Sequence, residues 1–188
     1  MSVVALVLAA GRSVRFGGDK RRATLDDGRS LLLHSVELAC SVFSDVRVVL
    51  REGERGEDLG LPGECRIIAS PDAGLGMGHS LAAGAASLVD SDAQAVAILL
   101  GDMPWIAPAT FGQLVAAAGA STIVLPRHDG QQGHPVLFGR DFWPALSRLT
   151  GDEGARSVVK AHPASCIRLE VQDAGVLQDV DRPEAVYR

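Results

Sequence analysis

Residues 3–20 read Val-Val-Ala-Leu-Val-Leu-Ala-Ala-Gly-Arg-Ser-Val-Arg-Phe-Gly-Gly-Asp-Lys, an apolar run that leads directly into small residues and then into a basic cluster. Small residues let a backbone approach a ligand closely, glycine allows the turn, and free backbone N–H groups can cradle a phosphate. Arg12, Arg15 and Lys20 then supply positive charge that suits a triphosphate. This pattern predicts an anion-binding loop at the carboxyl end of the first strand of an α/β sheet, where such folds bind their ligands.

The distribution of charge supports a small anionic ligand. The chain has a formal net charge of -5, although residues 1–22 contain five Lys or Arg and only one acidic residue. A protein this acidic is a poor candidate for binding nucleic acid through a broad basic face. A local basic loop in an acidic chain suits a small anion, although a solvated surface would produce the same cluster.

The length of 188 residues predicts a single domain over residues 1–188. Its core is expected to consist of Ala, Val, Leu and Ile, because 47% of the residues are hydrophobic and only 4% are aromatic. The three cysteines form no CxxC motif, so neither a disulfide framework nor a zinc site is expected, and a cytoplasmic location is the simplest context. The N-terminal apolar run is too short to span a membrane, and no membrane partner is expected.

Short apolar runs alternate with longer segments of helical period. Strands are expected at residues 3–8, 46–50, 66–69, 95–100, 122–125, 136–138 and 166–169, and helices at 31–42, 77–88, 108–118, 141–149 and 153–160. The charged, Gly-rich residues 51–64 are expected to form an exposed loop. This order of elements predicts a Rossmann-like, three-layer α/β/α sandwich around a mostly parallel sheet.

Two acidic segments are candidates for a metal site. Asp102 follows the most apolar strand, at the edge where α/β folds place ligands, and could hold Mg²⁺; it could equally cap a helix or close a turn. Asp179 and Asp181 would face the same side of an extended segment and could complete the site with Asp102. Alone, Asp181 also suits a cap for a final helix with Pro183 in its first turn.

Three weaker signals lie in loops. The Gly-rich segment 74–80 joins a strand to a helix and could hold a base or a phosphate at the helix N-terminus. His134, before a proline, is expected to be extended and accessible, either contacting a substrate or forming a surface turn. Asp152 suits a helix N-cap, and Arg156 could bind an anionic substrate or pair with a surface acid.

Six segments together suggest a family. In chain order they are residues 8–20, 76–81, 100–104, 133–138, 151–156 and 179–184. The most specific are Gly-His-Pro-Val-Leu-Phe at 133–138 and Gly-Asp-Glu-Gly-Ala-Arg at 151–156. The chain therefore resembles the molybdenum cofactor cytidylyltransferases, within the MobA-like nucleoside-triphosphate transferase family, over nearly its whole length.

The resemblance implies transfer of CMP from CTP to the molybdopterin-type cofactor with release of pyrophosphate, with Mg²⁺ or Mn²⁺ as the metal. A molybdoenzyme or its chaperone is the further partner that it allows. The nucleotide-binding residues that it implies are Leu8, Ala9, Ala10, Gly11, Arg12, Lys20, Gly76, Met77 and Ser80. It also implies catalytic roles for Arg12, Lys20 and Asp102, metal binding by Asp102 and Asp181, and acceptor binding by His134, Asp152 and Arg156.

The chain departs from the family pattern at Arg21-Arg22, where relatives are more apolar, and at His79. The two added cations are expected to influence which acceptor is used. The alternatives that stay open are a guanylyl- or sugar-phosphate nucleotidyltransferase of the same fold and a non-enzymatic carrier or chaperone of the cofactor. Ala10 favours the cytidylyl reaction, because guanylyl-transferring relatives tend to carry glycine there.

Overall fold

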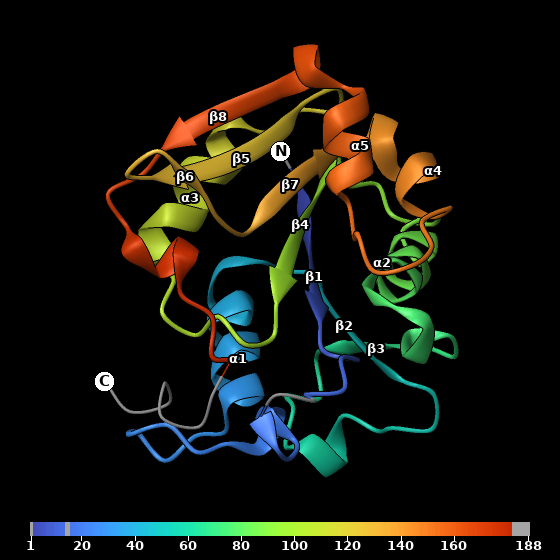
Figure 1. The fold of residues 1–188 in the computed structure, drawn as a ribbon, viewed down its shortest axis with the longest axis vertical. Helices are drawn as coiled ribbons and strands as arrows, with labels where there is room; N and C mark the ends of the chain where they lie inside the picture. Colours follow the sequence, from blue (N-terminus) through green and yellow to red (C-terminus); the bar gives the residue numbers. More distant parts are fainter. Residues whose placement is uncertain (1, 14–15, 182–188) are drawn as a thin grey trace.

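The computed structural model describes residues 2–13 and 16–181, and its strands form one sheet (Figure 1). The strands are β1 (Val3–Leu8), β2 (Val46–Arg51), β3 (Arg66–Ser70), β4 (Ala95–Leu100), β5 (Ile123–His128), β6 (Gln131–Gln132), β7 (Val136–Gly139) and β8 (Cys166–Glu170). Their order is β3-β2-β1-β4-β7-β5-β6, and β8 pairs with β5. The helices are α1 (Leu31–Val42), α2 (Met77–Ala86), α3 (Pro108–Ala117), α4 (Trp143–Leu146) and α5 (Arg156–Ala161).

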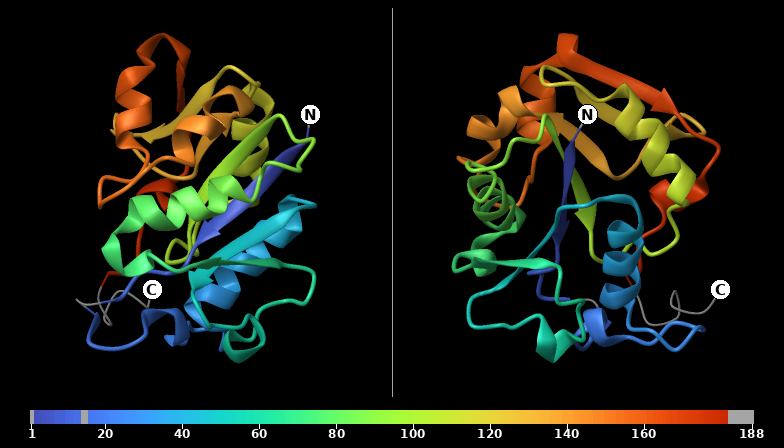
Figure 2. Two further views of the ribbon diagram at one scale, coloured as in Figure 1. Left: turned by 90° about the vertical axis from the view of Figure 1, so that its right-hand side faces the viewer. Right: turned by 180° about the vertical axis from the view of Figure 1, so that it is seen from behind.

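The predicted three-layer architecture is confirmed by the way side chains alternate along β1. Val3, Ala5 and Val7 belong to the apolar cluster that also contains residues of α1 and α3. Val4 and Leu6 point to the opposite face and join the cluster formed with α2, α4 and α5. In the view from behind, α1 and α3 lie on one side of the sheet and α2 lies on the other (Figure 2).

The sheet is mostly parallel, as predicted, with an antiparallel insertion that shapes the ligand edge. β1 runs parallel to both β2 and β4, whereas β7 pairs antiparallel with β4 and with β5. Because β7 runs backwards, its first residue lies beside the carboxyl end of β4, with Val136 paired to Ile98. The loop that carries His134 therefore reaches the same edge of the sheet as Asp102.

Two helices begin later than the sequence predicts. In segment 141–149, a 3-10 turn precedes α4, because Pro144 has no N–H to bond back to an earlier carbonyl and is accepted only in the first helical turn. The helix expected to start at Glu153 begins at Arg156, because Gly154 adopts φ +57°, in the left-handed region.

Residues 51–64 are only partly the exposed loop that was expected. Leu59, in a 3-10 turn at Glu57–Leu59, and Leu61 are buried in the α1 cluster and hold this segment against the protein. No helix among residues 2–13 and 16–181 is long and apolar enough to cross a membrane.

Candidate active site

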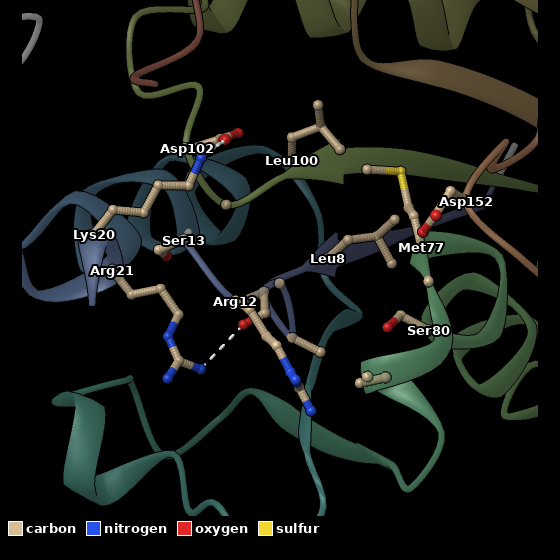
Figure 3. Close-up of a pocket in the computed structure, with 17 residues that line it drawn as sticks. Leu8, Arg12, Ser13, Lys20, Arg21, Met77, Ser80, Leu100, Asp102 and Asp152 are labelled. Atoms are coloured by element: carbon tan, nitrogen blue, oxygen red, sulfur yellow. Dashed lines mark hydrogen bonds and ion pairs between the residues drawn. The ribbon is translucent and has the colours of Figure 1, made fainter. Parts of the chain in front are cut away.

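A pocket of about 330 Å³ opens at the carboxyl ends of β1 and β4 (Figure 3). One wall is formed by residues 9–13, which we call the nucleotide loop, and the facing wall by the start of α2. The nine residues predicted to bind nucleotide all line this pocket: Leu8, Ala9, Ala10, Gly11, Arg12, Lys20, Gly76, Met77 and Ser80. Asp102 and Asp152 line it too, whereas Asp181, His134 and Arg156 are not among the lining residues.

Lys20 and Asp102 face each other at the margin of the pocket. The Lys20 Nζ lies 2.5 Å from Asp102 Oδ2 and 3.7 Å from Asp181 Oδ1, and it donates a hydrogen bond to the Val180 carbonyl at 3.3 Å. Asp102 lies two residues beyond the end of β4, a strand that is buried except for its last residue, Leu100. The arrangement brings together three segments that are far apart in sequence.

Asp102, Asp179 and Asp181 form a carboxylate cluster, with one ligand atom from each lying within 4.8 Å of the others. Among the described residues Asp102 Oδ1 is buried without a hydrogen-bond partner, which is costly unless a ligand satisfies it. Partial desolvation, then the charge of Asp181 and that of Asp102, raises the pKa of Asp179 above its ordinary value. Three carboxylates and one ammonium leave a formal charge of about -2, which suits a divalent cation.

The C-terminal segment is held in place by the core. Val180 is fully buried with Leu25 and Leu31, and its N–H donates to the Asp102 carbonyl at 3.0 Å. Val180 therefore anchors the two acidic residues that flank it. The predicted helix after Asp181, with Pro183 in its first turn, lies outside the described residues, and so does Arg15.

The glycines at the start of α2 accommodate a second loop. Gly78 N–H donates to the Gly151 carbonyl at 2.7 Å, and a Cβ on Gly78 would lie 2.6 Å from the Thr150 carbonyl oxygen. This contact brings Asp152 into the pocket wall. Asp152 is not the N-cap that was expected, because Ala155 precedes α5 and no side chain caps that helix.

His134 is more enclosed than the sequence suggests. Its Nδ1 atom is buried with no hydrogen-bond partner in the described part of the chain. Burial lowers the pKa of His134, and this effect outweighs the opposing influence of the nearby Asp102 carboxylate. The charge of Arg156, the first residue of α5, lowers it further. His134 and Arg156 thus influence each other beside the pocket.

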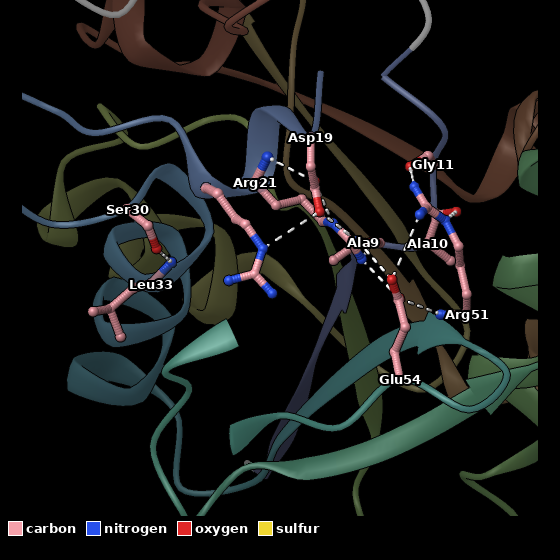
Figure 4. Close-up of polar contacts among 10 residues, drawn as sticks. Ala9, Ala10, Gly11, Asp19, Arg21, Ser30, Leu33, Arg51 and Glu54 are labelled. Carbon is pink, nitrogen blue, oxygen red and sulfur yellow. Dashed lines mark hydrogen bonds and ion pairs between the residues drawn. The ribbon is translucent and has the colours of Figure 1, made fainter. Parts of the chain in front are cut away.

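The structure corrects the interpretation of Arg21. Only 6% of this side chain is exposed, and it pairs with Asp19 and Glu54 (Figure 4). The two carboxylates raise the pKa of its guanidinium. Arg21 is therefore not a free cation for an acceptor, whereas Arg22 remains exposed.

Sequence reasoning did not single out Ser13, and it included Gly74 only as part of the Gly-rich segment 74–80. Ser13 lines the pocket with φ +45°, and its hydroxyl is buried without a partner among the described residues. Gly74 leaves room for Arg12, because a Cβ there would lie 2.8 Å from Arg12 Nη2. The small residue at 74 was the available signal, but its spatial neighbour was not visible from the sequence.

The MobA-like NTP transferase domain model matches residues 5–166, which include the nucleotide loop, Asp102 and the Gly133–Phe138 segment. The chain belongs to this family. It is a nucleotidyltransferase, and the resemblance found in the motifs is confirmed at the level of the family.

Three relatives of known name are similar to this MobA-like transferase. Purine catabolism protein PucB of Bacillus subtilis is 31% identical, covering 97% of this chain and 93% of the relative. The molybdenum cofactor cytidylyltransferase of Escherichia coli is 26% identical, with 95% and 91% covered. A probable molybdenum cofactor guanylyltransferase of Chloroflexus aggregans is 32% identical but covers 70% of this chain and 62% of its own length.

Solved structures agree with the fold. A homologue of Mycobacterium tuberculosis Rv0371c from Mycobacterium sp. strain JC1 superposes with a TM-score of 0.84 at 32% identity, covering 97% of this chain and 92% of that one. The Rv0371c protein of M. tuberculosis H37Rv, solved as a complex with manganese, gives 0.76 at 25% identity, with 91% and 89% covered.

Proposed function

We propose that this MobA-like transferase transfers CMP from CTP to the molybdopterin-type molybdenum cofactor and releases pyrophosphate. The observation that carries the proposal is a pocket with the nucleotide loop on one wall and Lys20 with the carboxylate cluster at its margin. The relative with the cytidylyl activity in its name matches almost the whole chain, whereas the guanylyl relative matches a shorter part. The reaction would take place in the cytoplasm.

The proposed chemistry needs no general base. A phosphate oxygen of the acceptor is already a nucleophile; it bonds to the α-phosphorus of CTP as the bond to the pyrophosphate oxygen breaks. Alignment of the two phosphates and neutralisation of the charge that develops are then the main requirements. Arg12, within the nucleotide loop, and Lys20, beside Asp102, would supply the positive charge.

Asp102, Asp179 and Asp181 would hold the metal ion, and the buried Asp102 Oδ1, which has no hydrogen-bond partner among the described residues, fits that role. Mg²⁺, or Mn²⁺ as in the solved relative, would stabilise negative charge on the phosphates when bound. Asp152 lines the pocket, whereas His134, in the loop before β7, and Arg156, at the start of α5, lie outside its lining; we assign these three residues to the acceptor. A neutral His134 there can both donate and accept a hydrogen bond.

Ala10 is expected to contribute to nucleotide choice through the position of the loop. Ala10 is one of the residues that line the pocket, but only 2% of it is exposed and its side chain packs into the α2 cluster. One methyl group is worth about 1–3 kcal/mol of discrimination, or roughly 10–200-fold, so Ala10→Gly should relax the preference for CTP over GTP without fully inverting it. We would compare kcat/KM for both nucleotides with the same acceptor.

The deciding experiment incubates the protein with Mg²⁺, molybdopterin and each nucleoside triphosphate in turn, and identifies the product by mass. A CMP adduct and stoichiometric pyrophosphate with CTP alone are expected. A GMP adduct would assign the guanylyl reaction. A parallel reaction replaces molybdopterin with a sugar phosphate, and turnover in that reaction alone would assign another acceptor. Cofactor binding without pyrophosphate release would indicate a carrier and refute the proposal.

A further inference from the structure

Two arginines hold three consecutive carbonyl groups of the nucleotide loop (Figure 4). Arg21 Nη1 donates to the Ala9 carbonyl at 3.0 Å. Arg51, the last residue of β2, donates from Nε to the Ala10 carbonyl at 3.2 Å and from Nη2 to the Gly11 carbonyl. The orientation of each of these three peptide groups is therefore fixed by a hydrogen bond to its carbonyl oxygen.

These contacts determine where the N–H groups of the loop point. In a trans peptide the C=O of one residue and the N–H of the next point in opposite directions. The N–H groups of Ala10, Gly11 and Arg12 therefore point away from the two guanidinium groups. Within the described residues none of the three donates to a protein acceptor, although the residues line the pocket. Donors without internal partners in a pocket wall suit an anion.

Glu54 connects the two arginines. Its Oε1 accepts from Arg21 Nη2 at 2.6 Å, and its Oε2 accepts from the Arg51 backbone N–H at 3.0 Å. Asp19 accepts from Arg21 Nε at 2.7 Å on the other side. Arg21, as the strongest influence, lowers the pKa of both Glu54 and Asp19.

The network carries little net charge, because two carboxylates balance two guanidinium groups. It therefore cannot act mainly by attracting phosphate over a distance. The same network accounts for Arg21, at which the sequence departs from the family pattern. A charged side chain can be buried there only with its two carboxylate partners. What the network can do is fix the orientation of the peptides that line the pocket.

We propose that Arg51 and Glu54 are positioning residues, which keep the N–H groups of the nucleotide loop directed at the phosphates of the bound nucleotide. The inference rests on the proposed nucleotidyl transfer but not on the identity of the acceptor or the base. Arg51 is the better residue to test, because 34% of its side chain is exposed, whereas Arg21 is buried and its loss would endanger folding.

Glu54→Gln separates positioning from charge by the sign of its effect. The substitution keeps the size of the side chain and raises the net charge beside the loop by one positive unit. If the network acted through charge, inorganic tripolyphosphate and CTP would bind more tightly. Because we infer a positioning role, we expect both to bind about tenfold more weakly, equivalent to about 1.4 kcal/mol.

Arg51→Lys and Arg51→Met provide the second comparison. Lysine keeps the charge but cannot span two adjacent carbonyls with a planar fork. We therefore expect both variants to weaken tripolyphosphate and CTP binding to a similar extent, with the CTP-to-GTP preference unchanged. Arg55→Met is the matched control, because Arg55 lies in the same loop, is 67% exposed and pairs with Glu57. The Arg55→Met variant should bind tripolyphosphate and CTP as tightly as the protein without substitutions does.

Calorimetry on the full chain with Mg²⁺, well below each variant's melting temperature, measures these affinities without an acceptor. Tighter binding by Glu54→Gln, full rescue by Arg51→Lys, or lower melting temperatures with unchanged affinities would each overturn the inference. If the expected pattern appears but no molybdopterin adduct forms, the positioning role stands and the proposed acceptor fails. If the unchanged protein binds neither tripolyphosphate nor CTP, both proposals fail.

Discussion

Replacement of Asp102 by asparagine tests the carboxylate cluster directly. Asparagine preserves the shape of the side chain but removes one of three carboxylates, so the formal charge of the cluster with Lys20 changes from about -2 to about -1. It also removes the charged partner that lies 2.5 Å from Lys20 Nζ. Loss of charge stabilisation at a metal site costs several kcal/mol; a loss of about 4 kcal/mol corresponds to roughly a thousandfold decrease in kcat.

Stability should change much less than activity. The Lys20 and Asp102 side chains are 20% and 18% exposed, so water still screens part of their interaction, and we expect the ion pair to contribute about 1 kcal/mol or less. Asp102 Oδ1 has no hydrogen bond among the described residues that the substitution would break.

The assay is pyrophosphate release per folded molecule at saturating CTP and Mg²⁺, with melting temperature measured on the same samples. Asp90→Asn, which makes the same chemical change at an exposed position away from the pocket lining, is the control. A folded Asp102→Asn protein with near-normal turnover would refute the assignment of Asp102 to the reaction.

Three further predictions follow from burial and close packing. Gly78→Ala should destabilise the protein by about 1–3 kcal/mol, because the added Cβ would clash with backbone oxygens of the 150–152 loop. Gly112→Ala should not destabilise the protein, because the space around Gly112 is open, and thermal melting compares the two variants. The lowered pKa of His134 predicts that its imidazole titrates with an NMR midpoint below 6.5. Because the folded state resists protonation of His134, the free energy of unfolding should fall as the pH drops below about 6.5. His134→Gln should show a smaller fall, and an equal fall in both proteins would contradict this. Burial, then contact with Cys40, raises the pKa of Cys65 to about 12, so iodoacetamide should modify this thiol far more slowly at pH 8 in folded than in unfolded protein; equal rates by mass spectrometry would count against it.

Where local chemistry decides the structure, the sequence alone was enough. The apolar runs of β1 and β4 and the start of α1 appear where predicted, and Ser30 caps α1, since its Oγ accepts from Leu33 N–H at 3.3 Å. Such elements depend on side-chain periodicity and on hydrogen bonds between near neighbours, which a sequence displays directly. The pocket-lining positions after β1 were predictable for the same reason, because ligands bind beyond the carboxyl ends of parallel strands.

Only the tertiary structure decided how distant groups meet. Cys40 and Cys65 are distant in sequence, yet their sulfur atoms lie 3.4 Å apart. The Arg21 guanidinium forms an ion pair with the Glu54 carboxylate, and no local sequence pattern connects these two residues. The antiparallel course of β7 brings His134 toward Asp102, and burial of Val180 places Asp179 and Asp181 beside it. These relations depend on strand order and long-range packing. A side chain's partner, and therefore its charge and its role, is set by neighbours that the linear sequence does not identify.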